Sequence, residues 1–356
     1  MRNFKVLETF RFIGALLIAT GHFIYWTGNN ENFPFPFSFI LIVDFFFVLS
    51  GFVITLKQDK KIEKTDEYLN DLFVGRTIRL LIPYIFLAIV YHLVYINLIY
   101  HQRIGIYSWI INLFLLFIVG LPGRVGGGPI GVAWALGLEF WIGTMYFPLI
   151  YFIKKKFKKG LLFISMILFI YSMGIIKQYS TTFMGIGYWK YSEVPFGILR
   201  ILSSYSIGVI CSILYKKLVK NFKFMKNKKV FFSLLEILIL LILFRLYGKV
   251  NYNRENEFVF PIIIGVFIVI FSFENGIISK ILSKVSNLGK LSYSIYLIHP
   301  FFVDLLVFYK IKNLNKYIVI SYFVFILLSS WLFYYFVERK VINLKYYFLN
   351  KKITTN

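Results

Sequence analysis

Arg11 and His22 lie eleven residues apart in the stretch ETFRFIGALLIATGHF, which is otherwise mostly apolar. Eleven residues are almost three turns of an α-helix, so both side chains would share one face, about 16 Å apart along the axis. Glu8 precedes Arg11 by one turn and could pair with it. A neutral imidazole accepts a proton near neutral pH, and a guanidinium binds anions. The same spacing also suits a snorkelling arginine and a histidine that hydrogen-bonds a neighbouring helix.

Two further stretches place ionisable groups among apolar residues. In RTIRLLIPY, Arg76 and Arg79 are one helical turn apart, which suits bidentate phosphate recognition or ordinary anchoring at a membrane surface. In WALGLEFW, Glu139 is an acid inside an apolar stretch, five residues after Trp134. A carboxyl group in such a place is either functional or paired with an arginine on another helix.

A last candidate, His299, lies in the stretch LSYSIYLIHPFF beside the helix-kinking Pro300 and close to hydroxyl groups such as that of Tyr296. A histidine that only packs is an equal alternative there. His92 and His101 form no metal-ligand spacing, and the single cysteine excludes a disulfide framework or a thiolate metal site. We therefore expect no metal.

The composition sets the class of structure that must hold these groups. Of the 356 residues, 59% are hydrophobic and 21% aromatic, and the mean hydropathy of +0.73 exceeds that of soluble domains. The long apolar runs are continuous, which predicts a polytopic helical membrane protein rather than a transmembrane barrel. The net charge of +24 comes from basic residues clustered in short loops between apolar runs. That distribution is typical of cytoplasmic loops and argues against nucleic-acid binding.

Eleven apolar runs are candidate membrane spans, and the first reads as an uncleaved helix because no small-residue cleavage site follows it. The runs cover roughly residues 10–27, 37–56, 78–100, 106–121, 130–153, 160–176, 196–216, 229–247, 258–274, 291–310 and 317–338. Basic residues predict that the loops at 57–79, 154–159, 216–229 and 280–290 are cytoplasmic, as is the C-terminal tail.

These loop assignments conflict in one place. Three candidate spans separate the loop at 57–79 from the basic run KKKFKK at 154, although both ends are predicted to be cytoplasmic. We expect the segment 106–130, which ends in GLPGRVGGGPIG, to be re-entrant; the alternative is that KKKFKK lies outside. The predicted fold is then an all-α polytopic membrane protein with about ten transmembrane helices plus one re-entrant segment. A transmembrane domain would cover 1–340, a cytoplasmic tail 341–356, and both termini would be cytoplasmic.

The motifs together resemble the membrane-bound acyltransferase family 3. The family pattern places an arginine (or glutamate), then ten residues, then a histidine in the first helix, as Arg11 and His22 are placed. A segment like FFFVLSGFVIT, here preceded by Asp44, an R-x-x-R pair followed by PY, a W-x4-E segment and LG-x-LSYSIYLIH follow in the same order. The chain stops after its last span, so we expect no fused SGNH esterase-like domain.

The resemblance implies transfer of an acyl group, usually acetyl, from a coenzyme A thioester to a hydroxyl, commonly that of a cell-surface sugar. We therefore expect an O-acetyltransferase of the bacterial inner (cytoplasmic) membrane with acetyl-CoA as co-substrate. The glycan acceptor would belong to O-antigen or lipopolysaccharide, capsule or exopolysaccharide; peptidoglycan and a small molecule are the other candidate acceptors. The expected partners of the enzyme are acetyl-CoA, the glycan and the lipid bilayer, and no nucleic acid is expected.

Roles for individual residues follow as hypotheses from the chemistry of acyl transfer. His22 is the general base or, alternatively, the carrier of an acyl-imidazole, and Glu139 or Asp44 orients it. We expect three arginines to bind the phosphates of coenzyme A and three other side chains to line the path of the acceptor. The arginines are Arg11, Arg76 and Arg79; the path residues are Trp134, Tyr296 and His299. We expect all of them to converge on one pocket.

Two rival classes remain compatible with buried charges. A transporter or flippase of a lipid-linked sugar would use them as a proton relay and would need no coenzyme A. A sensor or scaffold of the same fold would carry out no catalysis.

Overall fold

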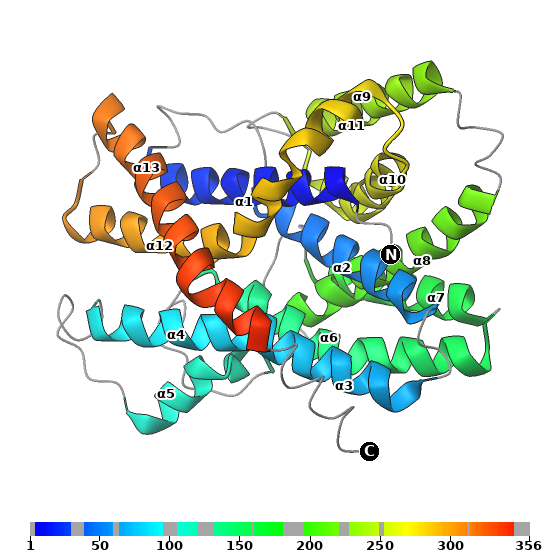
Figure 1. Cartoon of the computed structure of the whole chain (residues 1–356), viewed down its shortest axis with the longest axis horizontal. Helices are drawn as coiled ribbons and strands as arrows, with labels where there is room; N and C mark the ends of the chain where they lie inside the picture. The colour runs from blue at the N-terminus through cyan, green and yellow to red at the C-terminus, as the bar shows by residue number, and fades with distance from the viewer. Residues whose placement is uncertain are drawn as a thin grey trace. The chain divides into compact units, whose positions relative to one another are not determined.

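The structure is a computed structural model that describes residues 4–29, 39–59, 64–94, 105–119, 131–158, 160–180, 196–220, 228–248, 253–311 and 314–344 (Figure 1). Across these residues every regular element is a helix, which confirms the predicted fold class. Nine helices in the described part are long and apolar enough to cross a membrane. They are Lys5–Trp26, Thr65–Val94, Ala133–Lys156, Gly160–Tyr179, Phe196–Lys220, Lys229–Tyr247, Arg254–Ser272, Ile277–Phe308 and Lys316–Leu344. The chain is thus a multi-pass membrane protein.

Helix α2 (Ile42–Gln58) accounts for the second predicted span and has 17 residues. Two predicted loops are helical instead. The polar stretch TDEYLNDLFVGR forms α3 (Thr65–Arg76), which continues through the π-helix η2 (Thr77–Leu81) into α4 (Ile82–Tyr91). Likewise α11 (Ile277–Leu282) and the 3₁₀-helix η7 (Ser283–Leu291) lead directly into α12 (Ser292–Phe308). Acidic residues in the first turn of α3 favour this extension, because they complement the positive end of the helix dipole.

The segment predicted to be re-entrant differs from the others. Helix α5 (Ile106–Leu113) has eight residues, about 12 Å of helix against a hydrocarbon core of about 30 Å. Leu115 follows with a φ of 57°, and a 3₁₀-helix, η4, covers Leu116–Val119. The described part is therefore not one continuous span. The glycine-rich stretch at 120–130 lies outside the described residues, and its re-entrant course stays a prediction.

The chain divides into two compact units, which we describe separately. The first unit comprises Met1–Ile24, Asn30–Lys60 and Leu149–Ser292. It contains most of α1 (Lys5–Trp26), α2, the end of α6 (Ala133–Lys156) and the helices from α7 to η7. These are α7 (Gly160–Tyr179), α8 (Phe196–Lys220), α9 (Lys229–Tyr247), η6 (Arg254–Val259), α10 (Phe260–Ser272), α11 and η7.

Helices α2 and α8 pack closely in this unit, and α7 and α10 both pack on α8. Glycines make the α2–α8 approach possible. A β-carbon on Gly208 would lie 2.7 Å from the backbone nitrogen of Phe52 and 2.8 Å from the Cα of Gly51, too close for either backbone. Small residues at such a crossing are what allows two membrane helices to approach, since van der Waals contact drives their association.

Replacing Gly208 by alanine should therefore destabilise the protein by about 1–3 kcal/mol, because the backbones of α2 and α8 must separate. Thermal unfolding in detergent measures the loss. Gly174→Ala is the matched control, since nothing lies within 4 Å of a β-carbon at this position of α7. Equal melting temperatures for the two variants would contradict the close-packing argument.

The second unit comprises Tyr25–Asn29, Lys61–Pro148 and Tyr293–Asn356. It contains α3 to α5, most of α6, most of α12, α13 (Lys316–Phe333) and the π-helix η8 (Tyr334–Glu338). The hydroxyl-rich stretch at the start of α12 ties this helix to three other segments of the unit, because each hydroxyl bonds a different one. Tyr293 donates to the Leu80 carbonyl in η2, Ser294 donates to the Glu338 carboxylate in η8 at 2.7 Å, and Tyr296 donates to the Val132 carbonyl.

Candidate functional site

Helix α1 carries the arginine and the histidine of the first motif. It runs without interruption from Lys5 to Trp26, so the eleven-residue spacing places Arg11 and His22 on one face. Arg11 Nη1 lies 3.2 Å from a carboxylate oxygen of Glu8, which confirms the expected ion pair within the helix. Both side chains stay partly exposed, at 21% for Arg11 and 35% for Glu8. The pair is therefore accessible to an anionic ligand that competes for the guanidinium.

The imidazole of His22 is half-buried and lies against an aromatic ring from the turn before α2. The ring centroids of His22 and Phe39 are 4.9 Å apart, with an interplanar angle of 72°. Gly21 makes room for this contact, since a β-carbon there would overlap the Phe39 ring. The Gly-His pair of the sequence thus has a structural reason: the glycine admits the ring that lies beside the histidine.

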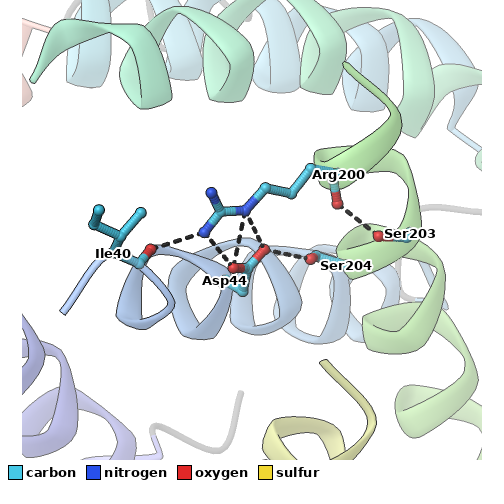
Figure 2. A network of polar contacts seen from close by, with 5 residues as sticks. All are labelled: Ile40, Asp44, Arg200, Ser203 and Ser204. Atoms are coloured by element: carbon cyan, nitrogen blue, oxygen red, sulfur yellow. Dashed lines mark hydrogen bonds and ion pairs between the residues drawn. The ribbon is translucent and has the colours of Figure 1, made fainter. Parts of the chain in front are cut away.

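Asp44, predicted to orient His22, makes different contacts in the structure (Figure 2). Its carboxylate accepts hydrogen bonds from Arg200 Nε at 3.0 Å and Nη2 at 2.6 Å, and from the Ser204 hydroxyl at 2.8 Å. Asp44, Arg200 and Ser204 are all fully buried. Burying a charge is tolerated only when it is paired and hydrogen-bonded, and this pair meets that condition. These contacts favour a structural role for Asp44.

Arg200 is not among the site residues predicted from the sequence, although its surroundings there already mark it as unusual. It is a charged residue in the apolar stretch FGILRILSSYSIG, which becomes the N-terminal half of α8. A charge at such a depth is costly and therefore has a partner or a function. Its partner Asp44 lies 156 residues earlier in the chain, so no local pattern identifies it.

The two arginines of RTIRLLIPY have different environments in the second unit. Arg76 is 7% exposed; it donates to the backbone carbonyl of Glu139 and lies 5.5 Å from the centroid of the Phe147 ring. Arg79 is exposed on the π-helix η2. Arg76 therefore ties α3 to α6, whereas Arg79 can reach a ligand. Short π-helical segments are frequent at functional sites.

The remaining predicted residues also lie in the second unit. Glu139 is half-buried on α6, five residues beyond the buried Trp134. His299 is fully buried on α12, with Nδ1 3.1 Å from the Ile295 carbonyl. Since a carbonyl only accepts, Nδ1 carries the proton in the neutral ring and Nε2 is its basic nitrogen. The Tyr296 hydroxyl is engaged by the Val132 carbonyl, which makes it a helix anchor as well as a candidate ligand contact.

The predicted set is thus shared between the units. The first holds Arg11, His22 and Asp44; the second holds Arg76, Arg79, Trp134, Glu139, Tyr296 and His299. In the second unit the Arg76 guanidinium and the Glu139 backbone are brought into direct contact. In the first, Arg11 and His22 are linked by one rigid helix.

A further charged cluster lies at the ends of three helices in the first unit. Lys154 of the predicted loop KKKFKK belongs to α6 and is 3% exposed; its ammonium donates to the Thr55 carbonyl at 2.8 Å and to Asp59 at 2.6 Å. Lys216 of α8 also pairs with Asp59. Burial acts to raise the pKa of Asp59, but the hydrogen bonds from both lysines outweigh it and hold that pKa below its ordinary value. The cluster therefore joins α2, α6 and α8 through one carboxylate.

A family model described as an acyltransferase domain, family 3, matches residues 4–335. The matched region includes every candidate residue of the predicted site. No curated protein and no solved structure matches the chain.

Proposed function

Because the chain belongs to the acyltransferase family 3, we propose that this enzyme is an integral-membrane O-acetyltransferase that moves acetyl from cytoplasmic acetyl-CoA to a sugar hydroxyl. The acceptor would be a cell-surface polysaccharide, and the enzyme would lie in the inner membrane with both termini cytoplasmic. One observation carries the assignment of the chemistry. Within the family match, a single uninterrupted helix bears Arg11 near one end and His22 near the other. That helix offers an anion-binding group and a proton acceptor about 16 Å apart.

His22 is the general base in this proposal. Its neutral imidazole removes the proton from the acceptor hydroxyl while the oxygen attacks the thioester carbonyl carbon. The tetrahedral intermediate then collapses, the C–S bond breaks, and coenzyme A leaves as a thiolate that takes up the proton from the imidazolium. In the alternative order the imidazole attacks first, forms an acyl-imidazole and releases coenzyme A before the acceptor reacts.

The three arginines proposed to bind the acetyl-CoA donor differ in their exposure and in their contacts. Arg79 is exposed on η2 and has the planar fork that binds phosphate oxygens bidentately. Arg11 is partly exposed and could release Glu8 in favour of a phosphate. Arg76, whose guanidinium is buried against the Glu139 carbonyl and the Phe147 ring, supports α6 in addition to any contact with the donor.

Arg79→Ala should raise the KM for acetyl-CoA about tenfold or more with little change in kcat, because it removes charge-assisted hydrogen bonds to the donor. Its melting temperature should fall less than that of Arg76→Ala, since Arg79 is exposed whereas Arg76 is buried. Arg76→Ala should lower the melting temperature as well, because it leaves the Glu139 carbonyl without the guanidinium. Steady-state kinetics and thermal unfolding of both variants measure these effects. An unchanged KM for Arg79→Ala would refute its role in donor binding.

Thermal stabilisation of the purified protein by acetyl-CoA tests the proposal directly, because a ligand that binds the folded state raises its melting temperature. Mass analysis of surface glycans with and without the protein then identifies the acceptor by the gain of one acetyl group. Stabilisation by a lipid-linked sugar but not by acetyl-CoA, with glycan masses unchanged, would favour the transporter alternative.

A further inference from the structure

We propose that Arg200 is a positioning residue for the imidazole of His22, acting through the Ile40 carbonyl and the Phe39 ring. The inference rests on the proposed function, because it gives Arg200 a role only if His22 performs the chemistry. All the residues involved belong to the first unit, and a direct contact supports each step.

The first step is the bond between Arg200 and the turn before α2. Arg200 Nη2 donates to the Ile40 carbonyl at 2.7 Å and to Asp44 Oδ2 at 2.6 Å. Figure 2 shows the guanidinium reaching from α8 to lie between that carbonyl and the Asp44 carboxylate. The buried ion pair therefore holds two points at once, the first turn of α2 and the backbone just before it.

The second step is the turn itself. The backbone nitrogen of Ile42 donates to the Phe39 carbonyl at 3.2 Å, and that of Asp44 donates to the Leu41 carbonyl at 2.9 Å. Residues 39–41 thus form a hydrogen-bonded turn that leads into α2. Because Ile40 lies within this turn, fixing its carbonyl also fixes the position of the neighbouring Phe39.

The third step is the contact of Phe39 with α1. The ring fits the space left by Gly21 and stands 4.9 Å from the His22 ring at 72°. An aromatic neighbour in this geometry restricts the rotation of the imidazole and excludes water from one of its sides. A base must lie within hydrogen-bond reach of the proton it removes, so restricting the ring favours the productive orientation.

The geometry requires an arginine at position 200. A guanidinium has a planar fork of donors that can bind a carboxylate and a carbonyl together, whereas an ammonium is a compact charge on a flexible stem. Lysine would keep the charge opposite Asp44 but would lose the bond to Ile40 or the second bond to the carboxylate. Arg200→Lys therefore separates the positioning of His22 from the neutralisation of Asp44.

Kinetics of Arg200→Lys, Phe39→Leu and the double variant test the proposal. Each single variant should lower kcat about tenfold while the KM for acetyl-CoA stays within about twofold, because the base is misplaced but donor binding is untouched. The double variant should be no slower than the worse single variant, since both changes interrupt the same chain of contacts. Ser204→Ala is the matched control, because it removes one hydrogen bond to Asp44 and keeps the Arg200–Ile40 bond; its kcat should equal that of the wild type.

The rate at which diethyl pyrocarbonate modifies His22, followed by peptide mass analysis, gives a second readout that needs no activity. It should rise in Arg200→Lys and in Phe39→Leu, with the buried His299 of the same molecule as an internal reference. If His22→Ala stays active, the proposed function fails, yet this rate still tests whether Arg200 acts on the histidine through Ile40 and Phe39.

A wild-type kcat in Arg200→Lys, multiplicative effects in the double variant, or an unchanged modification rate would each overturn the proposal. Should Arg200→Lys not accumulate as folded protein, the neutral pair Arg200→Gln with Asp44→Asn replaces it. That pair avoids an unpaired buried charge but lacks the fork that reaches Ile40. The same losses in kcat and the same rise in modification rate are expected of it, and wild-type values would refute the positioning role.

Discussion

His22→Ala should abolish acyl transfer while the protein still inserts into the membrane and folds. A positioned general base contributes about 10²–10⁴-fold to a rate, and loss of a nucleophile that forms an acyl-enzyme would be larger still. The side chain is half-buried on α1 and its ring contacts Phe39, so its removal takes away chemistry more than packing. The measurement is the transfer rate of purified enzyme in detergent, together with its melting temperature.

His92→Phe is the control for this experiment. His92 is buried in the second unit with its ring 3.8 Å from that of Trp109, and phenylalanine keeps an aromatic ring in that place. Its transfer rate should stay near that of the wild type. A His22→Ala enzyme that retains most of its activity would show that another group is the base.

Peptide mass analysis of the wild-type enzyme distinguishes direct base catalysis from the acyl-imidazole route. Incubation with acetyl-CoA and no acceptor should leave the wild-type enzyme unmodified if His22 is a base. A peptide containing His22 that gains one acetyl group would instead establish the acyl-imidazole route.

Arg200→Met should destabilise the protein strongly, by about 3–5 kcal/mol, because it leaves a buried carboxylate without its cation. Both members of the Asp44–Arg200 pair are 0% exposed, so water cannot replace the guanidinium without rearrangement of α2 and α8. The double variant Asp44→Leu with Arg200→Met should recover most of the loss, since an apolar pair carries no desolvation penalty. Unfolding of the three proteins in denaturing detergent measures the difference.

Arg245→Met is the matched control, because it removes the charge of an arginine that is exposed. Arg245 lies exposed in the last turn of α9, where an arginine contributes little beyond its interaction with the helix dipole. Its replacement should change the free energy of unfolding by no more than about 0.5 kcal/mol. An Arg200→Met protein as stable as this control would show that the buried pair does not hold α2 against α8.

The sequence by itself determined the class of fold and the local pairings. Continuous apolar runs can satisfy their backbone groups in lipid only as helices, so the spans follow from composition and length. Helical periodicity also places Glu8 beside Arg11 and puts His22 on the same face, because α1 is long and unbroken. The exceptions are α3 and η7, where a polar stretch is helical although hydropathy alone predicts a loop.

The tertiary structure decided which buried charges meet and which side chains remain accessible. The sequence shows no ionic partner near Asp44, and the structure pairs it with Arg200, which lies 156 residues later on another helix. Arg76 and Arg79 look equivalent as a motif, yet packing on α6 buries the first and leaves the second exposed. Phe39 reaches His22 only because Gly21 leaves room and the turn before α2 is held in place. Periodicity determines contacts within one helix, whereas contacts between helices depend on how side chains of many segments fill space together.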